Sequence, residues 1–478
     1  MRASTFVRLA SLVFAASFAG VARMHAQQAP LTPNQQAARD IYKELLETNT
    51  SVMTAGTTIA AQQVAKRYRD AGFPESDVFL GGVKPEKFNV VLRYHGKGGA
   101  NAPKPLLLLA HLDVVEALKS DWSPDLDPFK FLERDGYFYA RGTSDDKAMA
   151  SIFVANIIRL KKEGYVPDRD IIVALTADEE GGCCNGVRWL IANHRELVDA
   201  AYVINEGGGG SLREGKPFLN MVQATEKVFG NFTVTAHNKG GHSSVPRPDN
   251  AIYQLSEGLV KFSHYAFPVQ FNEVTRAFFE RTAAVETPET GAAMRALLKN
   301  PNDVAASAIV SRDPRYNSTL RTTCVATMLS GGHAQNALPQ TASVTINCRM
   351  LPNSDPADIR AQIVKAIADT GLEVSAAPPI RNTSPSPLLP DVMGAVETIT
   401  KQLFGNIPVI PIMGTGATDS APFRVLGIPA YGVSGLMGDP EDVRAHGRDE
   451  RMLMKSYFDG QEFLYRLTKM LSTPRTVP

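Results

Sequence analysis

The chain has 478 residues, of which 44% are hydrophobic and 21% are charged. This balance is typical of a globular protein and argues against a disordered or fibrous chain, and the length predicts two or three domains. Lys and Arg together number 50, whereas Asp and Glu number 49. Because the charges nearly cancel, the sequence does not favour a nucleic-acid partner.

The first 26 residues have the pattern of a secretory signal peptide. Arg2 and Arg8 precede an apolar run from Leu9 to Phe18, and small residues follow it up to Ala26. The run is too short for a permanent membrane span, and no other stretch approaches about 20 apolar residues. We therefore expect an exported protein, periplasmic or secreted, without a membrane span.

Residues 33–224 alternate between helix and strand signals. Helical spacing covers about residues 33–69, and another helix is expected at about residues 146–163. Strand-like apolar runs are FNVVLRY, PLLLLAHLD, IIVALTADE and AYVINEGGGG. Strands separated by helices predict an α/β fold with a parallel or mixed sheet that is covered on both faces. This segment is the first part of the predicted main domain.

The pattern then changes, because FGNFTVTAHNK alternates like a half-exposed antiparallel strand. A helix at about residues 250–262, the runs RTTCVATML and TASVTINCRM, and a helix with Asp355 as its N-cap follow. These elements predict a small α+β domain over residues 225–377, with a mostly helical insertion at about residues 271–315. After a Pro-rich linker, residues 378–478 are expected to rejoin the first sheet.

The sequence contains four cysteines, Cys183, Cys184, Cys324 and Cys348. Cys324 and Cys348 each lie in a strand-like run, and the two flank a turn-rich segment. A disulfide between them is one interpretation, and two buried free thiols are the other. Export permits disulfides, although a domain of this size does not require them. We interpret Cys183 and Cys184 as structural.

Residues of the metal-ligand type lie at the ends of the apolar strands and in nearby loops. They are His111, Asp113, Asp145, Asp146, Glu179, Glu180, Glu206 and, near the C-terminus, His446. Strands of an open α/β sheet place ligands at their carboxyl ends. Crowded carboxylates repel one another unless protons or a cation offset their charge, and a metal is the better explanation here. Imidazole with carboxylate suits zinc, manganese or cobalt, of which zinc is the commonest.

In order along the chain, the motifs are LLAHLDVV, DGYFYARGTSDDK, ADEEGG, NEGGG, GGHSSVP, GGHAQNALP, NCRMLP, GATDSAPF and RAHGRDER. This series resembles the co-catalytic zinc peptidases and deacylases, a family that includes carboxypeptidase G, carboxypeptidase S, aminoacylase, acetylornithine deacetylase and carnosine dipeptidase. The similarity runs from about residue 35 to the end, and the insertion with FNEVTRAFFERTA looks like the carboxypeptidase S branch. It implies a zinc-peptidase catalytic domain that a smaller lid and dimerisation domain interrupts, with a possible homodimer through the lid.

The resemblance also implies two zinc ions per chain, with manganese or cobalt as possible replacements. The implied ligands are Asp145 as the bridge, His111 and Glu206 on one side, and Glu180 and His446 on the other. Glu179 would be the general base that takes a proton from a metal-bridging water and passes it to the leaving nitrogen. Asp113 would orient His111 and raise its basicity.

Four further residues are implied as substrate contacts. His242 would reach an active site, often that of the partner subunit, and stabilise the oxyanion, with Asn336 as a second polar contact. Arg349 would hold a substrate carboxylate through its planar fork, although a surface strand residue is the plainer interpretation. Gly416 lies in a glycine run that would let the backbone approach the substrate.

The sequence therefore favours an exported zinc metallopeptidase that removes the residue at a free C-terminal carboxylate of short peptides. The alternative is an amidohydrolase that cleaves N-acyl amino acids, because the chemistry at the amide is identical and only the acyl-side pocket differs. A third hypothesis is a non-catalytic binding protein that kept the fold. It predicts loss of Glu179 or of a metal ligand, and all six positions are intact.

Overall fold

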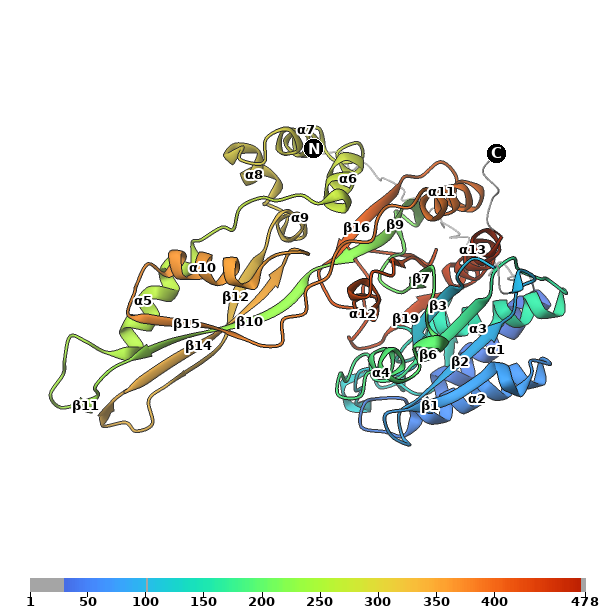
Figure 1. Ribbon diagram of the computed structural model, residues 1–478, viewed down its shortest axis with the longest axis horizontal. Coiled ribbons are helices and arrows are strands. Elements are labelled where there is room, and N and C mark those ends of the chain that lie inside the picture. The colour runs from blue at the N-terminus through green and yellow to red at the C-terminus, as the bar shows by residue number, and fades with distance from the viewer. Residues whose placement is uncertain (1–29, 100–101, 474–478) are drawn as a thin grey trace, which may run out of the picture.

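The computed structural model describes residues 30–99 and 102–473. The predicted signal peptide, residues 1–26, lies outside these ranges. Two lobes are visible, a large one in which helices cover a sheet and a narrow arm that extends away from it (Figure 1). Among the described helices, none is long and apolar enough to cross a membrane.

The large lobe is built on a mixed sheet. Its strands are β1 (Val78–Gly82), β2 (Phe88–Tyr94), β3 (Leu106–His111), β6 (Ile171–Thr176), β7 (Tyr202–Asn205), β8 (Gly210–Arg213), β9 (Lys216–Glu226), β16 (Val409–Gly414), β17 (Ala430–Gly432) and β18 (Met437–Gly438). They run in the order β1-β2-β6-β3-β7-β17-β9-β8-β18, and β16 pairs with β9. β3 is parallel to β6 and β7, whereas β1 and β2 pair antiparallel. The prediction of a parallel or mixed sheet is confirmed, because the sheet is mixed. The C-terminal segment returns to this sheet through β16 and β17.

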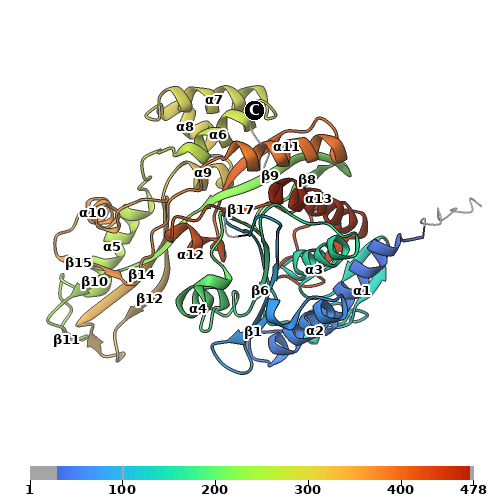
Figure 2. The same ribbon diagram turned by 45° about the vertical axis from the view of Figure 1, so that its right-hand side comes forward.

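Helices cover both faces of this sheet (Figure 2). Leu106 and Leu108 of β3 belong to one apolar core, whereas Leu107 and Leu109 belong to the other, because alternate side chains of a strand point to opposite faces. The helices of the first core are α1 (Pro33–Glu47), α2 (Gly56–Asp70), α3 (Lys147–Lys162), α11 (Pro390–Phe404) and α13 (Met454–Ser472). Those of the second are α4 (Gly186–Asn193) and α12 (Ser420–Val425). A small side sheet contains β4 (Leu132–Arg134), β5 (Tyr137–Tyr139) and β19 (Arg451–Leu453).

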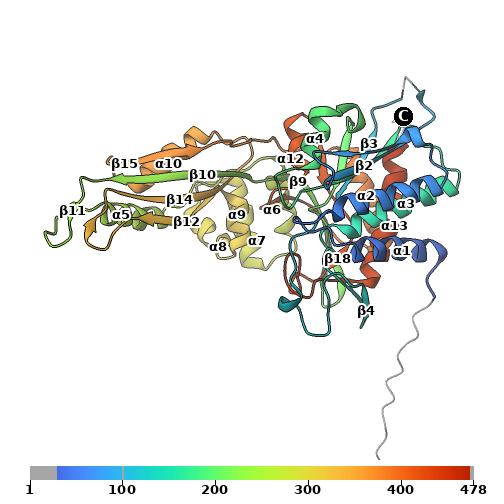
Figure 3. The same cartoon turned by 90° about the horizontal axis from the view of Figure 1, so that it is seen from below.

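The narrow arm, which we call the lid, contains an antiparallel sheet in the order β12-β14-β10-β15. Its strands are β10 (Val228–His237), β12 (Thr323–Gly331), β14 (Thr341–Met350) and β15 (Leu372–Ala377). The helices α5 (Ala251–Ser263) and α10 (Pro356–Ile367) pack against it, and Asp355 caps α10 as predicted. At the far tip, β11 (Gly241–His242) pairs with β13 (Ala337–Leu338), well away from the large lobe (Figure 3).

A helical insertion lies between α5 and β12. It consists of α6 (Glu273–Thr282), α7 (Pro288–Lys299), α8 (Val304–Val310) and α9 (Pro314–Leu320) and has its own apolar core around Phe279, Met294 and Leu320. Its Arg281 donates to Glu397 at 2.9 Å and to the carbonyl of Val409 at 2.6 Å, so the insertion also contacts the large lobe.

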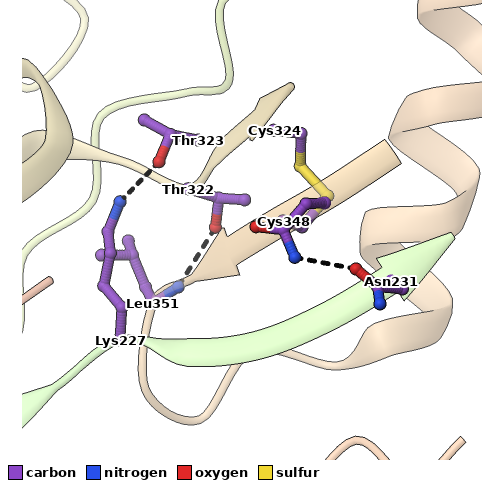
Figure 4. The surroundings of a disulfide bond; sticks show 8 residues. Lys227, Asn231, Thr322, Thr323, Cys324, Cys348 and Leu351 are labelled. Carbon is purple, nitrogen blue, oxygen red and sulfur yellow. Dashed lines mark hydrogen bonds between the residues drawn. A yellow bond between two sulfur atoms is a disulfide. The ribbon is translucent and has the colours of Figure 1, made fainter. Parts of the chain in front are cut away.

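Cys324 and Cys348 form a disulfide between β12 and β14 (Figure 4), which confirms the first of the two interpretations. The two cysteines are direct partners in the strand register. Cys183 and Cys184 are free; Cys183 is exposed and Cys184 is half-buried.

Candidate metal centre and active site

The metal-type residues converge at one edge of the large sheet. His111 is the last residue of β3, Glu179 and Glu180 follow β6, and Glu206 follows β7. These three strands are parallel neighbours, so their carboxyl ends meet at the same edge. Asp145 comes from the loop before α3. The ordinary geometry of a parallel sheet thus assembles most of the cluster.

Asp145 lies between two histidines. Its Oδ1 is 2.9 Å from Nε2 of His111, and its Oδ2 is 3.1 Å from Nε2 of His446, which comes from the loop between β18 and β19. The same His446 nitrogen is 2.8 Å from Oε1 of Glu180. Donor atoms of His111, Asp145 and Glu180 all lie within 4.8 Å of one another, so this group could hold a metal ion.

Burial and crowding perturb the charges of the cluster. Burial raises the pKa of Glu179 to about 9, and the carboxylates of Asp419, Glu206 and Glu180 add to this shift. Burial also raises the pKa of Glu206 well above its usual range. Asp145 differs, because hydrogen bonds to the two histidines outweigh its burial and lower its pKa. A cation among these groups would relieve the repulsion.

Asp113 contributes in two ways, of which the sequence indicated one. Its backbone carbonyl lies 3.0 Å from Nδ1 of His111, whereas its carboxylate oxygen is 3.7 Å from that nitrogen. The carboxylate instead accepts the backbone N–H groups of Glu179 at 3.1 Å and Glu180 at 3.0 Å. Asp113 therefore holds the loop that carries these two acidic residues.

Sequence reasoning missed Glu450, which is fully buried. Its carboxylate accepts from Arg141 at 2.7 Å, from the backbone N–H of Gly142 at 3.0 Å and from both the N–H and the hydroxyl of Ser144 at 2.7 and 2.8 Å. These donors lie in the loop that ends at Asp145, so Glu450 positions that loop. The only sequence signal was its proximity to His446.

The implied substrate contacts are not gathered around the cluster. His242 and Asn336 are exposed at the tip of the lid, where the carbonyl of Asn336 accepts from the N–H of Ser243 at 3.0 Å. Arg349 is on β14 with its guanidinium 5.1 Å from the centre of the Phe229 ring. Gly416 is exposed in the loop after β16, and a Cβ there would meet no atom within 4 Å.

A cavity of about 730 Å³ lies between the large lobe and the lid. Glu179 and Asp419 line it from the large lobe, and Lys227 and Phe229 line it from the junction with the lid. Burial raises the pKa of Asp419 to about 6; its carboxylate accepts from Asn185 at 2.7 Å. The cavity therefore joins the acidic cluster to the base of the lid.

Cys183 and Cys184 also line this cavity, with their sulfur atoms 2.6 Å apart. Together with Asp178 they have donor atoms close enough to hold a metal ion. The Asp178 carboxylate is already used, because it accepts from the N–H of Cys184 at 2.7 Å and pairs with Lys87 at 3.1 Å. The His111 cluster is thus the better candidate.

A sheet that gathers imidazoles and carboxylates at its carboxyl edge, beside a cavity, fits a metal-dependent hydrolase. The sequence model of peptidase family M20/M25/M40 matches residues 107–470, and the chain belongs to this family. The family suggested by the motifs is thereby confirmed.

Curated relatives are similar to this chain in sequence, and a solved structure is similar to it in fold. The human N-fatty-acyl-amino acid synthase/hydrolase PM20D1 is 26% identical, and the match covers 79% of this chain and 76% of the relative. The probable carboxypeptidase S-like 2 of Dictyostelium discoideum is 28% identical over 80% of this chain and 74% of its own length. The M20 family metallo-carboxypeptidase Sso-CP2 of Sulfolobus solfataricus is 19% identical with a TM-score of 0.65, covering 91% of this chain and 99% of that one.

Proposed function

We propose that the protein is a zinc-dependent exopeptidase that hydrolyses the amide bond next to a free C-terminal carboxylate in short peptides. The observation that carries this proposal is the position of Asp145, which turns one carboxylate oxygen toward His111 and the other toward His446. A carboxylate between two imidazoles suits a bridge between two cations. Glu179 lies in the same cluster and lines the adjacent cavity, where a substrate would meet it.

The donor set fits zinc, and manganese or cobalt accept the same donors. His111 and Glu206 would hold one ion with Asp145, and Glu180 and His446 would hold the other. Burial raises the pKa of both Glu180 and Glu206, and bound cations would offset that penalty. When bound, the ions lower the pKa of water and polarise the scissile carbonyl.

Glu179 is the general base of this proposal. It takes a proton from the attacking water and passes it to the leaving nitrogen. With a pKa of about 9 it would be protonated at neutral pH, so the base needs positive charge in the cluster to become ionised. Asp113 fixes its backbone by accepting the Glu179 N–H at 3.1 Å.

An amidohydrolase that cleaves N-acyl amino acids is the second candidate. Two observations favour it: Val83, Trp189 and Phe229 give part of the cavity an apolar lining, and a curated relative is named an N-fatty-acyl-amino acid synthase/hydrolase. Both candidates cleave an amide whose amine side carries a free carboxylate. They differ only in the group on the acyl side.

We expect hydrolysis of a panel of dipeptides, acyl-dipeptides and N-acyl amino acids to release the C-terminal amino acid and to stop after chelation. Elemental analysis of the same preparation should find about two metal ions per chain. Zinc added after dialysis should restore activity. The preferred acyl group distinguishes the two candidates, and release that a chelator does not affect would contradict both.

Export to the periplasm or beyond the cell is part of the proposal. It is supported by the basic start, the apolar run and the small residues of the first 26 residues.

A homodimer through the lid is also part of the proposal. β12 is an edge strand of the lid sheet, and its Val325, Met328 and Leu329 are 59%, 70% and 71% exposed. Exposed apolar residues on an edge strand are typical of an interface. His242 lies at the tip of the lid, away from the metal-type cluster of its own chain. It would therefore reach the active site of a second copy of the chain.

Mixing two inactive variants tests this dimer. His242→Ala and Glu179→Gln chains, unfolded and refolded together in equal amounts, should regain about a quarter of wild-type activity, because half of all dimers are then mixed and each mixed dimer carries one complete site of two. Refolded separately, each variant should stay inactive. Continued inactivity of the mixture, with dimers present in sedimentation analysis, would contradict the exchange of His242 between subunits.

A further inference from the structure

Lys227 is a buried lysine that has no carboxylate partner among the described residues. Three lysines of the described chain are buried, Lys87, Lys147 and Lys227. Lys87 pairs with Asp178 at 3.1 Å, and Lys147 donates to two backbone carbonyls at 2.8 and 2.9 Å. Lys227 is 2% exposed, and its ammonium group donates to the hydroxyl of Thr323 at 3.0 Å. An ammonium group has three N–H donors, so Lys227 retains the capacity to bind an anion.

The surroundings of Lys227 are positive. Arg349 is the direct strand partner of Thr323 and of Phe229, which places it beside the residue that Lys227 contacts. Burial, together with the charge of Arg349, lowers the pKa of Lys227 to about 7. The neighbouring Glu226 does not compensate it, because that carboxylate pairs with Arg424 at 3.0 Å. A bound anion would stabilise both cations.

The cavity connects Lys227 to the catalytic cluster. Glu179, Lys227 and Arg381 all line it, whereas Arg349 does not. A molecule in this cavity can therefore contact the base with its amide and Lys227 with an anionic end. Arg349, for which the sequence indicated the carboxylate contact, has its guanidinium 5.1 Å from the centre of the Phe229 ring.

Lys227 is also held in place. It is the single residue between β9 and β10, and its backbone N–H donates to the carbonyl of Gly414 at 2.9 Å. The Cys324–Cys348 disulfide (Figure 4) joins β12 to β14, at the positions next to Thr323 and Arg349. A fixed donor loses little conformational entropy when it binds a ligand.

We propose that Lys227 binds the free carboxylate of the substrate and is the residue that makes the enzyme specific for a C-terminal carboxylate. The inference rests on the proposed function and adds the residue that recognises the amino-acid end. It applies equally to peptides and to N-acyl amino acids, because both carry that carboxylate.

The test compares benzoyl-Gly-Phe with its C-terminal amide, in the metal-loaded full-length protein. Lys227→Met should lower kcat/KM for the free acid by about 30-fold or more, mainly by raising KM. A loss of about 30-fold is the lower end for removal of a hydrogen-bonded charge partner. For the amide the change should stay within about threefold, because that substrate has no charge to lose. Lys227→Arg should keep most of the preference for the acid. The matched control is Lys216→Met, an exposed lysine at the start of β9, which should behave as the wild type.

Other outcomes are equally informative. Equal losses on acid and amide would overturn the proposal, because a purely structural lysine affects both substrates alike. If Lys227→Met fails to fold, Lys227→Gln, which removes the charge but can still donate to Thr323, replaces it: a loss confined to the acid supports the proposal, and equal losses on acid and amide contradict it. If the wild type cleaves neither substrate, the proposed function fails, and calorimetry of benzoyl-Gly-Phe binding then decides: weaker binding to Lys227→Met supports the subsite, and equal binding overturns it.

Discussion

Replacement of Glu179 by Gln is expected to lower kcat by roughly 10²- to 10⁴-fold while the metal content stays unchanged. Gln keeps the size of the side chain but cannot accept the proton of the attacking water. The backbone N–H of Glu179, which donates to Asp113 at 3.1 Å, is the same in the variant, so the loop should keep its position. Steady-state kinetics and elemental analysis on the same sample measure both quantities.

The matched control for this variant is Glu214→Gln, at an exposed position in the turn between β8 and β9. It removes the same charge from the chain without touching the cluster, so kcat should stay at the wild-type value. Full activity in the Glu179 variant would remove this residue from the role of base. A large loss of metal would instead indicate that Glu179 acts as a ligand.

Asp145→Asn should abolish the paired metal site and lower kcat by about 10³-fold or more, because the metal contribution amounts to several kcal/mol. Asp145 presents one oxygen to His111 and the other to His446, whereas Asn offers a single neutral oxygen. Elemental analysis should find well below one metal ion per chain, because both ions lose the ligand that they share. Circular dichroism checks that the fold is retained.

The comparison for this prediction is His446→Asn. This change removes a ligand of only one of the two ions, the one that Glu180 also holds. The other ion should remain, so the metal content should fall to about one ion per chain. Retention of both ions in Asp145→Asn would show that this carboxylate does not bridge them. Equal metal losses in the two variants would leave no separate role for the bridge.

The parts of the fold that local patterns determine could be predicted closely. β14 begins and ends at the residues of the run TASVTINCRM, and Asp355 caps its helix, because alternation and capping are visible within a few residues. The cluster could be predicted for a related reason. Parallel strands bring their carboxyl ends to one edge, so strand-end residues such as His111 and Glu206 meet without any knowledge of distant contacts.

Long-range contacts could not be predicted in the same way. Glu450 contacts Arg141 from 309 positions along the chain, and no local pattern encodes that pairing. Lys227 carried no signal in the sequence, and its burial is visible only in the structure. The hairpin of β8 and β9 was also missed, because its sequence does not alternate clearly.

The roles of the lid residues could not be predicted fully either, because they too depend on long-range arrangement. The motifs around His242 and Asn336 indicated contacts with an active site, but their distance from the cluster of the same chain depends on the length and direction of the lid strands (Figure 1). The sequence identifies such residues as polar and exposed. The three-dimensional arrangement places them at the tip of the lid, away from the cluster of their own chain.

The position of Glu450 has a consequence for the order in which the enzyme becomes competent during synthesis. The ribosome makes His111, Asp145, Glu179 and Glu206 early, but the loop before Asp145 receives its buried carboxylate only after more than 300 further residues. His446 comes from the same late segment. A chain that ends before this segment therefore cannot assemble the centre, and hydrolytic activity is reserved for chains that have been translated almost to the end.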